Sequence, residues 1–213
     1  MTFADDQRAT AWQVQSLLMS YPDEQLVDRQ PLLRAATRTL PAPLATPLNA
    51  FMDHIEATPL TELAADYVAT FDHRKRFSPY LTYFAYGDTR KRGMALLRFK
   101  HAYRAAGLEL DDSELPDHLA VVLEFAATGD PVVGQRLMIE HRAGLELMRL
   151  GLHEAGSPWA NVLESVSATL PPLGRREHDA VARLAAEGPP EEEVGLAPFA
   201  PPEYMPQPQG GPR

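Results

Sequence analysis

The sequence of 213 residues contains no cysteine. A disulfide framework, a thiolate zinc site, a thiolate-held iron-sulfur cluster and a cysteine nucleophile are therefore excluded. The N-terminus carries acidic residues where a signal peptide carries positive charge, and no apolar segment follows it. No apolar run approaches the roughly 18–20 residues that cross a bilayer. We therefore expect a cytoplasmic protein that does not insert directly into a membrane.

The motifs of common enzyme chemistries are also missing. The chain has no G-x-G-x-x-G, G-x-x-x-x-G-K-[ST] or G-x-S-x-G, so neither a phosphate-cradling loop nor a nucleophile elbow is indicated. Its seven histidines form no H-x-x-x-H, H-E-x-x-H or E-x-x-H pattern. We therefore expect no catalysis, no metal and no cofactor of its own. Adjacent Asp and His at 53–54, 72–73, 117–118 and 178–179 keep a helical metal-dependent hydrolase open as an alternative.

Positive charge is scarce overall but concentrated in one segment. The formal net charge is -9, which disfavours general nucleic-acid binding. Residues 74–104 nevertheless contain nine Lys or Arg and a single acid, Asp88. We call this segment the basic band. It favours solvated helix faces paired with neighbouring acids, and an adaptor that uses the band to bind an acidic or nucleic-acid partner is the alternative.

Helical periodicity dominates the rest of the chain. Apolar residues recur at helical spacing over several turns, as in the stripe formed by Val133, Leu137, His141, Leu145, Met148 and Leu152. Five Ser, Thr or Asp residues precede a proline and are typical of helix starts: Thr46, Thr58, Ser78, Asp130 and Ser157. These patterns predict helices over 8–20, 24–39, 47–57, 59–71, 79–86, 89–106, 116–127, 131–155, 158–169 and 175–187. No segment predicts a strand, so the expected fold is an all-α, single-domain helical bundle over residues 1–187.

The composition changes after residue 187. Residues 188–213 are dense in proline and poor in apolar side chains, which predicts a disordered tail. Phe199, Tyr204 and Met205 would suit a short linear motif, although the composition favours a passive tail.

The most distinctive region extends from residue 80 to residue 119. It combines an aromatic cluster, which includes Tyr80, Tyr83 and Tyr86, with a helix start at 114–119 that is rich in acids. Aromatic residues beside an acidic rim suit a groove that accepts a basic amphipathic peptide. A plain core role for the tyrosines is the alternative, and Asp117 would then serve the first turn of the next helix, where its charge suits the dipole.

Four segments of the chain resemble the NarJ family, the chaperones dedicated to assembly of respiratory molybdenum nitrate reductase. The matching segments are L-L-x-x-Y-P-D-E-x-L at 17–26, Y-V-x-T-F-D at 67–72, L-T-Y-F-x-Y-G-D-T-R-K-R-G-M-A-L at 81–96 and E-L-P-D-H-L-x-V-V-L-E-F-A-A at 114–127. The likeness covers residues 9–170 and leaves out the proline-rich tail.

The resemblance implies the all-helical fold of the redox-enzyme maturation chaperones and a role without catalysis. The implied partner is the N-terminal peptide of the apo catalytic (alpha) subunit of nitrate reductase, held while molybdenum cofactor is inserted. We expect the chaperone to act as a monomer or weak dimer. The resemblance assigns peptide recognition to Leu115, Pro116, Asp117 and His118, and the pattern of residues adds Tyr83, Tyr86 and Glu124 as groove candidates.

Overall fold

The computed structural model describes residues 3–111 and 114–188, and within these ranges the chain is helical. Its elements are α1 (Asp5–Met19), α2 (Glu24–Thr37), α3 (Ala42–Ala57), α4 (Leu60–Phe71), the 3₁₀ helix η1 (Lys75–Phe77), α5 (Tyr83–Tyr86), α6 (Arg90–Ala105), α7 (Leu119–Thr128), α8 (Pro131–Glu140), α9 (Arg142–Glu154), α10 (Trp159–Thr169) and α11 (Arg175–Glu187). The β-pairing in these ranges is a single bridge between Tyr80 and His118. The predicted all-α class is confirmed. The division between domain and tail stays a prediction, because residues 189–213 lie outside the described ranges.

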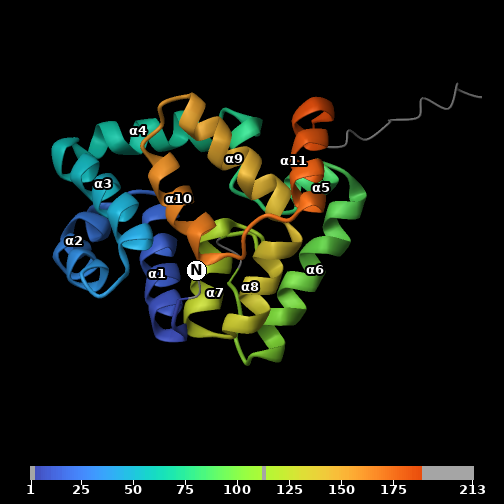
Figure 1. Ribbon diagram of the computed structural model, residues 1–213, viewed down its shortest axis with the longest axis horizontal. Helices are drawn as coiled ribbons and strands as arrows, with labels where there is room; N and C mark the ends of the chain where they lie inside the picture. Colours follow the sequence, from blue (N-terminus) through green and yellow to red (C-terminus); the bar gives the residue numbers. More distant parts are fainter. Residues whose placement is uncertain (1–2, 112–113, 189–213) are drawn as a thin grey trace, which may run out of the picture.

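Helices α1, α7 and α10 lie at the centre of the bundle (Figure 1). Helix α1 packs on both α7 and α10, and α3 also packs on α10. Trp12 on α1 is buried and donates from Nε1 to the hydroxyl of Thr169 at 3.0 Å. Gln15 donates to the hydroxyl of Ser165 at 2.8 Å. These buried bonds fix the rotation of α1 against α10, since leaving either donor unpaired in the core would cost about 1–3 kcal/mol.

One of the five expected proline-associated caps has the predicted hydrogen bonds. Asp130 accepts from the backbone N–H groups of Val132 and Val133 at 3.0 and 2.9 Å, and α8 begins at the following proline. The expectation for Thr46 is wrong, because α3 begins at Ala42 and runs through Pro47. Helices α4 and α10 begin after their prolines without a side-chain cap. Residues 78–79 begin no helix and instead lead into the Tyr80 bridge.

The single helix predicted over 131–155 is two helices, which meet at His141. The His141 ring nitrogen Nδ1 lies 2.9 Å from the carbonyl oxygen of Leu137, the acceptor that a continuous helix would offer to the backbone N–H of His141. Side-chain competition for a backbone acceptor is a known way to interrupt a helix. The apolar stripe therefore continues across a break that periodicity alone does not reveal.

Candidate functional site

Two segments that are far apart in the sequence meet at the centre of the site. The backbone N–H of Leu81 donates to the carbonyl of Asp117, and the N–H of Leu119 donates to the carbonyl of Pro79, both at 2.9 Å. This exchange brackets the bridge between Tyr80 and His118. It also explains why the predicted helix over 79–86 is reduced to α5, because extended pairing occupies its first residues.

The buried side chain of Asp117 stabilises this junction through hydrogen bonds. Its side chain is fully buried and accepts from the Thr82 backbone N–H at 3.1 Å and from the Thr82 hydroxyl at 2.5 Å. Arg92 Nη2 lies 3.6 Å from the same carboxylate, and Arg92 Nε donates to the Thr82 hydroxyl at 3.1 Å. The expectation that Asp117 serves the first turn of α7 is wrong, since α7 begins at Leu119 and its N-cap is His118.

A groove of about 430 Å³ opens beside the bridge. We call it the Tyr80 groove. Its walls combine the end of α1, part of α4, residues 79–80 and the first turns of α7. Aromatic rings come from Tyr21, Tyr67 and Tyr80, and three acids line it as well: Asp72, Glu114 and Glu124. The lining includes no Lys or Arg. Such a surface presents apolar area together with negative charge, which suits a segment that carries both apolar and basic side chains.

Hydrogen bonds hold two of the tyrosines in position. The Tyr80 hydroxyl donates to Glu114 Oε1 at 3.2 Å, and the Tyr67 hydroxyl donates to the Met19 carbonyl at 3.1 Å. Burial, aided by the charge of Glu114, raises the pKa of Tyr80 to about 12. Burial likewise raises the pKa of Tyr67. Both rings therefore stay neutral near pH 7, and the groove owes its negative charge to the three carboxylates.

Comparisons with known proteins show the family of the chain. The sequence model described as nitrate reductase delta subunit matches residues 37–164. The chain belongs to this family. It is 31% identical over 163 residues to the probable nitrate reductase molybdenum cofactor assembly chaperone NarJ of Bacillus subtilis, covering 76% of this chain and 89% of that protein.

Two further similarities extend the comparison. The chain is 39% identical over 159 residues to the nitrate reductase-like protein NarX of Mycobacterium tuberculosis, covering 74% of this chain but 24% of NarX, so it spans about a quarter of that relative. A crystal structure of a putative redox enzyme maturation protein from Archaeoglobus fulgidus superposes with a TM-score of 0.53 at 22% identity, covering 83% of this chain and 93% of that one. The structural likeness shows that this delta-family chain shares its fold.

The predicted recognition residues occupy different places. His118 and Glu124 line the Tyr80 groove. Pro116 is buried, and its carbonyl accepts from the Tyr103 hydroxyl at 2.5 Å. Leu115, 40% exposed, is not among the residues that line the groove. Tyr83 and Tyr86 do not line it either, and Tyr83 instead lines a separate cavity beside α9.

Glu114 belongs to the acidic rim expected from the sequence, whereas Tyr21 and Asp72 are groove residues that the sequence did not propose. A signal was present, because Tyr21 and Asp72 each stand inside a segment that carries the family resemblance. What the sequence does not show is that these segments converge on one groove. That convergence depends on α1 and α4 both ending beside α7.

Much of the basic band is paired with acids, as the favoured interpretation expected. Ion pairs join Lys75 to Asp88 at 3.1 Å, Arg76 to Glu154 at 3.4 Å, Arg92 to Asp88 at 3.6 Å and Arg98 to Glu140 at 2.9 Å. These contacts leave less uncompensated charge for an adaptor role than the sequence suggests. In the ranges that the structure describes, no three His, Asp or Glu side chains gather as metal ligands would. None of the described helices is long and apolar enough to cross a membrane.

His118 caps α7 in its neutral form. Its Nδ1 accepts from the backbone N–H of Ala120 at 3.2 Å, and its ring stands edge-on to Tyr80 with centroids 5.3 Å apart. Burial lowers the pKa of His118, and the nearby carboxylates of Glu114, Asp117 and Asp72 oppose this only in part. A proton on Nδ1 would remove the acceptor and with it the cap.

We therefore expect the free energy of unfolding to fall as the pH drops below the ordinary histidine pKa of 6.5. Below this pH the unfolded chain binds a proton at His118, whereas the folded chain does not. The contribution of neutral His118 to the free energy of unfolding is therefore fully present above about pH 7 and declines by up to about 1.4 kcal/mol per pH unit below it. His118→Asn keeps a capping acceptor without the titration, so its stability should fall less steeply. Urea unfolding of both proteins between pH 7.5 and about 5 measures the difference. Burial also lowers the pKa of His141, which is present in both proteins and contributes equally to the pH dependence of each. Only a difference between the two proteins therefore reports on His118. Equal dependence of stability on pH would contradict the capping role of neutral His118.

Proposed function

We propose that this protein is a cytoplasmic assembly chaperone for nitrate reductase. It binds the N-terminal segment of the apo catalytic subunit in the Tyr80 groove, without catalysis, and holds that subunit open for molybdenum cofactor insertion. The names of its relatives in Bacillus subtilis and Escherichia coli, the latter 33% identical over 115 residues, support the chaperone role. It is expected to act as a monomer or weak dimer.

The observation that carries the peptide site is the combination of three aromatic walls with three carboxylates in one groove. A client helix or turn would insert an apolar side chain between Tyr67 and Tyr80, while its Lys or Arg residues pair with Asp72 and Glu124 at the rim. Both of these acids are exposed, so they are available to a partner without unfolding. The buried Asp117 acts behind the surface as the group that holds the junction.

Neutralising the two rim acids is expected to weaken peptide binding without changing stability. In Asp72→Asn with Glu124→Gln, the affinity for the N-terminal peptide of the catalytic subunit should fall about tenfold at low salt, equivalent to about 1.4 kcal/mol. The difference should shrink as salt rises, since the lost term is electrostatic. Calorimetric titration of the full chain with the peptide measures it.

The matched control is Glu62→Gln with Asp66→Asn. These exposed acids lie on α4 outside the groove, so the control changes the net charge equally. Equal affinities in the two double variants would move the peptide site elsewhere. If neither the peptide nor the whole apo subunit binds the unmodified chain, the chaperone proposal itself fails.

A further inference from the structure

A second apolar hollow lies away from the Tyr80 groove. It measures about 470 Å³, within the range of about 300–1,000 Å³ that holds ligands, and its lining shares no residue with the groove. We call it the α9–α11 cavity. Its apolar wall is formed by Phe84, Leu147, Leu150, Val181 and Leu184. Its charged edge has two cations, Lys75 and Arg76, and one acid, Glu154.

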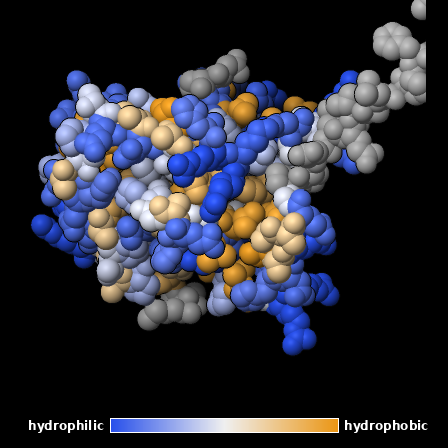
Figure 2. All heavy atoms as spheres, turned by 90° about the horizontal axis from the view of Figure 1, so that it is seen from above, coloured by the Kyte–Doolittle hydropathy of each residue, from blue (hydrophilic) through white to orange (hydrophobic). Residues whose placement is uncertain are grey.

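Helix α11 is incompletely covered along this hollow. It packs on α9, yet none of its thirteen residues is buried. Leu150 on the facing helix is 42% exposed. Seen from above, onto the side where α4, α9 and α11 lie, hydrophobic side chains form an exposed patch beside strongly hydrophilic ones (Figure 2). An amphipathic helix with an open apolar face needs a further element to cover it.

We propose that residues 191–199 of this chain's own C-terminal segment occupy the α9–α11 cavity. Gly188, the last described residue, lines the cavity, and its φ of +73° turns the chain at the end of α11. An extended chain spans up to about 3.5 Å per residue, so residue 191 can reach the cavity edge and Phe199 can reach any part of its wall. Tethering at the mouth also gives this segment an effective concentration in the millimolar range.

The segment matches the cavity in charge and in apolar content. It reads E-E-E-V-G-L-A-P-F, so three glutamates precede the apolar side chains of Val194, Leu196 and Phe199. The glutamates would face the edge formed by Lys75 and Arg76. Both cations already contact acids, but the pairs with Asp88 and Glu154 are exposed, and exchanging such pairs costs about 0–1 kcal/mol.

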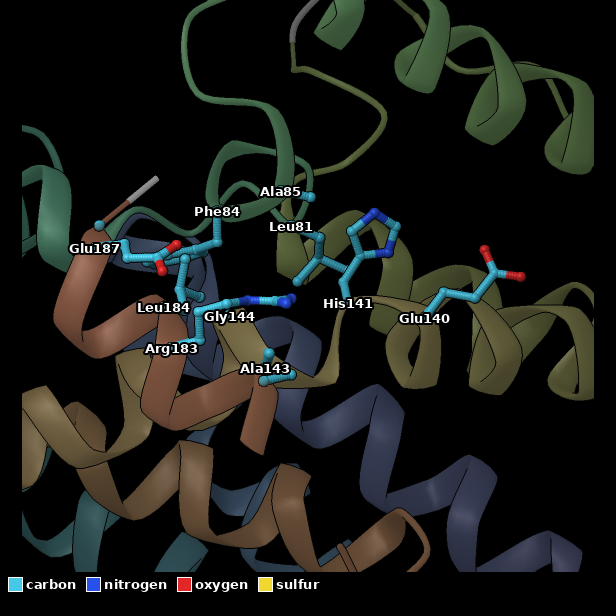
Figure 3. Close-up of a pocket in the computed structure, with 12 residues that line it drawn as sticks. Leu81, Phe84, Ala85, Glu140, His141, Ala143, Gly144, Arg183, Leu184 and Glu187 are labelled. Atoms are coloured by element: carbon cyan, nitrogen blue, oxygen red, sulfur yellow. The ribbon is translucent and has the colours of Figure 1, made fainter. Parts of the chain in front are cut away.

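A neighbouring hollow fits this segment less well. It measures about 310 Å³ and lies on the other side of Leu184, against α5 and the junction of α8 and α9 (Figure 3). Glu140 and Glu187 line it together with Arg183 and His141. Its lining has two carboxylates and one arginine, whereas the α9–α11 cavity has one carboxylate and two cations. This charge balance favours the α9–α11 cavity for an acidic segment.

Disulfide trapping tests this assignment in the full chain, because the natural sequence has no cysteine to interfere. With Leu150→Cys and Phe199→Cys, mild oxidation should give an intramolecular disulfide about tenfold faster than in the control pair. The control combines Phe199→Cys with Leu32→Cys on α2. Leu32 is 68% exposed, and α2 lies on the side of the bundle away from α11 (Figure 1). Replacing the glutamates at 191–193 by glutamine should slow trapping severalfold.

Equal rates in the two pairs would overturn the proposal. Disulfide-linked dimers as the main product would overturn it too, because a second copy would then supply the occupant. The trapped protein should bind the client peptide as tightly as the reduced protein, since the cavity is separate from the Tyr80 groove. Failure of trapping therefore leaves the chaperone proposal intact, and failure of peptide binding leaves this one intact.

Discussion

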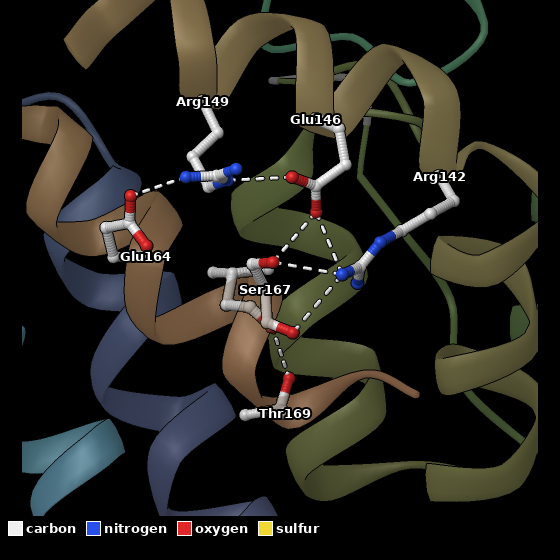
Figure 4. Close-up of polar contacts among 7 residues, drawn as sticks. Arg142, Glu146, Arg149, Glu164, Ser167 and Thr169 are labelled. Carbon is white, nitrogen blue, oxygen red and sulfur yellow. Dashed lines mark hydrogen bonds and ion pairs between the residues drawn. The ribbon is translucent and has the colours of Figure 1, made fainter. Parts of the chain in front are cut away.

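Replacing Glu146 by alanine is expected to lower the free energy of unfolding by about 3–5 kcal/mol, among the largest effects of a single substitution in this protein. Glu146 is 2% exposed and lies between two arginines on α9 (Figure 4). Its carboxylate is 2.8 Å from Arg142 Nη2 and 2.7 Å from Arg149 Nε. It also accepts from the Ser167 hydroxyl at 2.8 Å, which ties α9 to α10.

The cost arises from the charges that the substitution leaves behind. Arg142 is 7% exposed in its side chain, and burial lowers its pKa while Glu146 opposes the shift. Without Glu146, Arg142 keeps its hydrogen bonds to the hydroxyl and carbonyl oxygens of Ser167 and the more distant charge of Glu177. Arg149 suffers less, because it is more exposed and retains Glu164 at 2.5 Å. Most of the cost comes from leaving the Arg142 cation buried without a neighbouring carboxylate, rather than from the loss of the ion pair itself.

Urea and thermal unfolding measure this effect, with Glu154→Ala as the matched control on the same helix. Glu154 pairs with Arg76 at 3.4 Å, and both side chains are more than half exposed, so its loss should cost less than about 1 kcal/mol. At about 2–4 °C per kcal/mol for a chain of this length, Glu146→Ala should lower Tm by roughly 10 °C. A cost below about 1 kcal/mol for Glu146→Ala would show that Arg142 finds another partner.

The Glu146 network also illustrates what the sequence can and cannot predict. Spacing places Arg142, Glu146 and Arg149 on one helical face, a pattern equally typical of a solvated surface. Their burial depends on α10, whose Ser167 and Glu164 complete the network. Local periodicity carries no information about a partner helix that follows later in the chain.

The same distinction separates the confirmed helices from the misjudged boundaries. Helices α2, α4 and α11 agree with their predicted extents within two residues. The break at His141 and the shortening of α5 depend on particular side-chain and inter-segment hydrogen bonds. These hydrogen bonds outweigh the helix propensity of the residues involved once the folded chain brings the neighbouring segments together.

The sequence predicts only part of the lining of the candidate site. The acidic and aromatic residues near 80 and 114–124 were expected to form a groove, and His118 and Glu124 line the Tyr80 groove. Asp117 belongs to the same sequence motif as His118, but its side chain points into the core and accepts hydrogen bonds from Thr82. A motif fixes which residues occur together, whereas the backbone bridge decides which of two buried neighbours lines the groove.

Replacing Asp117 by alanine is accordingly expected to act on stability first, lowering the free energy of unfolding by about 2–4 kcal/mol. The substitution strands the buried Thr82 N–H and removes the carboxylate that Arg92 faces. The bridge between Tyr80 and His118 should loosen, so that both side chains leave their positions in the groove. Asp117→Asn keeps an acceptor for Thr82 but loses the charge, and about half of the cost should remain.

Stability and affinity together distinguish this positioning role from direct contact with the client. For Asp117→Ala, unfolding should shift strongly, and peptide affinity measured well below its Tm should fall as the groove loosens. For Asp72→Asn with Glu124→Gln, affinity should fall while unfolding stays within about 0.5 kcal/mol, because these acids are exposed. If Asp117→Ala lost affinity at unchanged stability, its carboxylate would have to reach the peptide. That outcome would require the junction at Thr82 to open when the client binds.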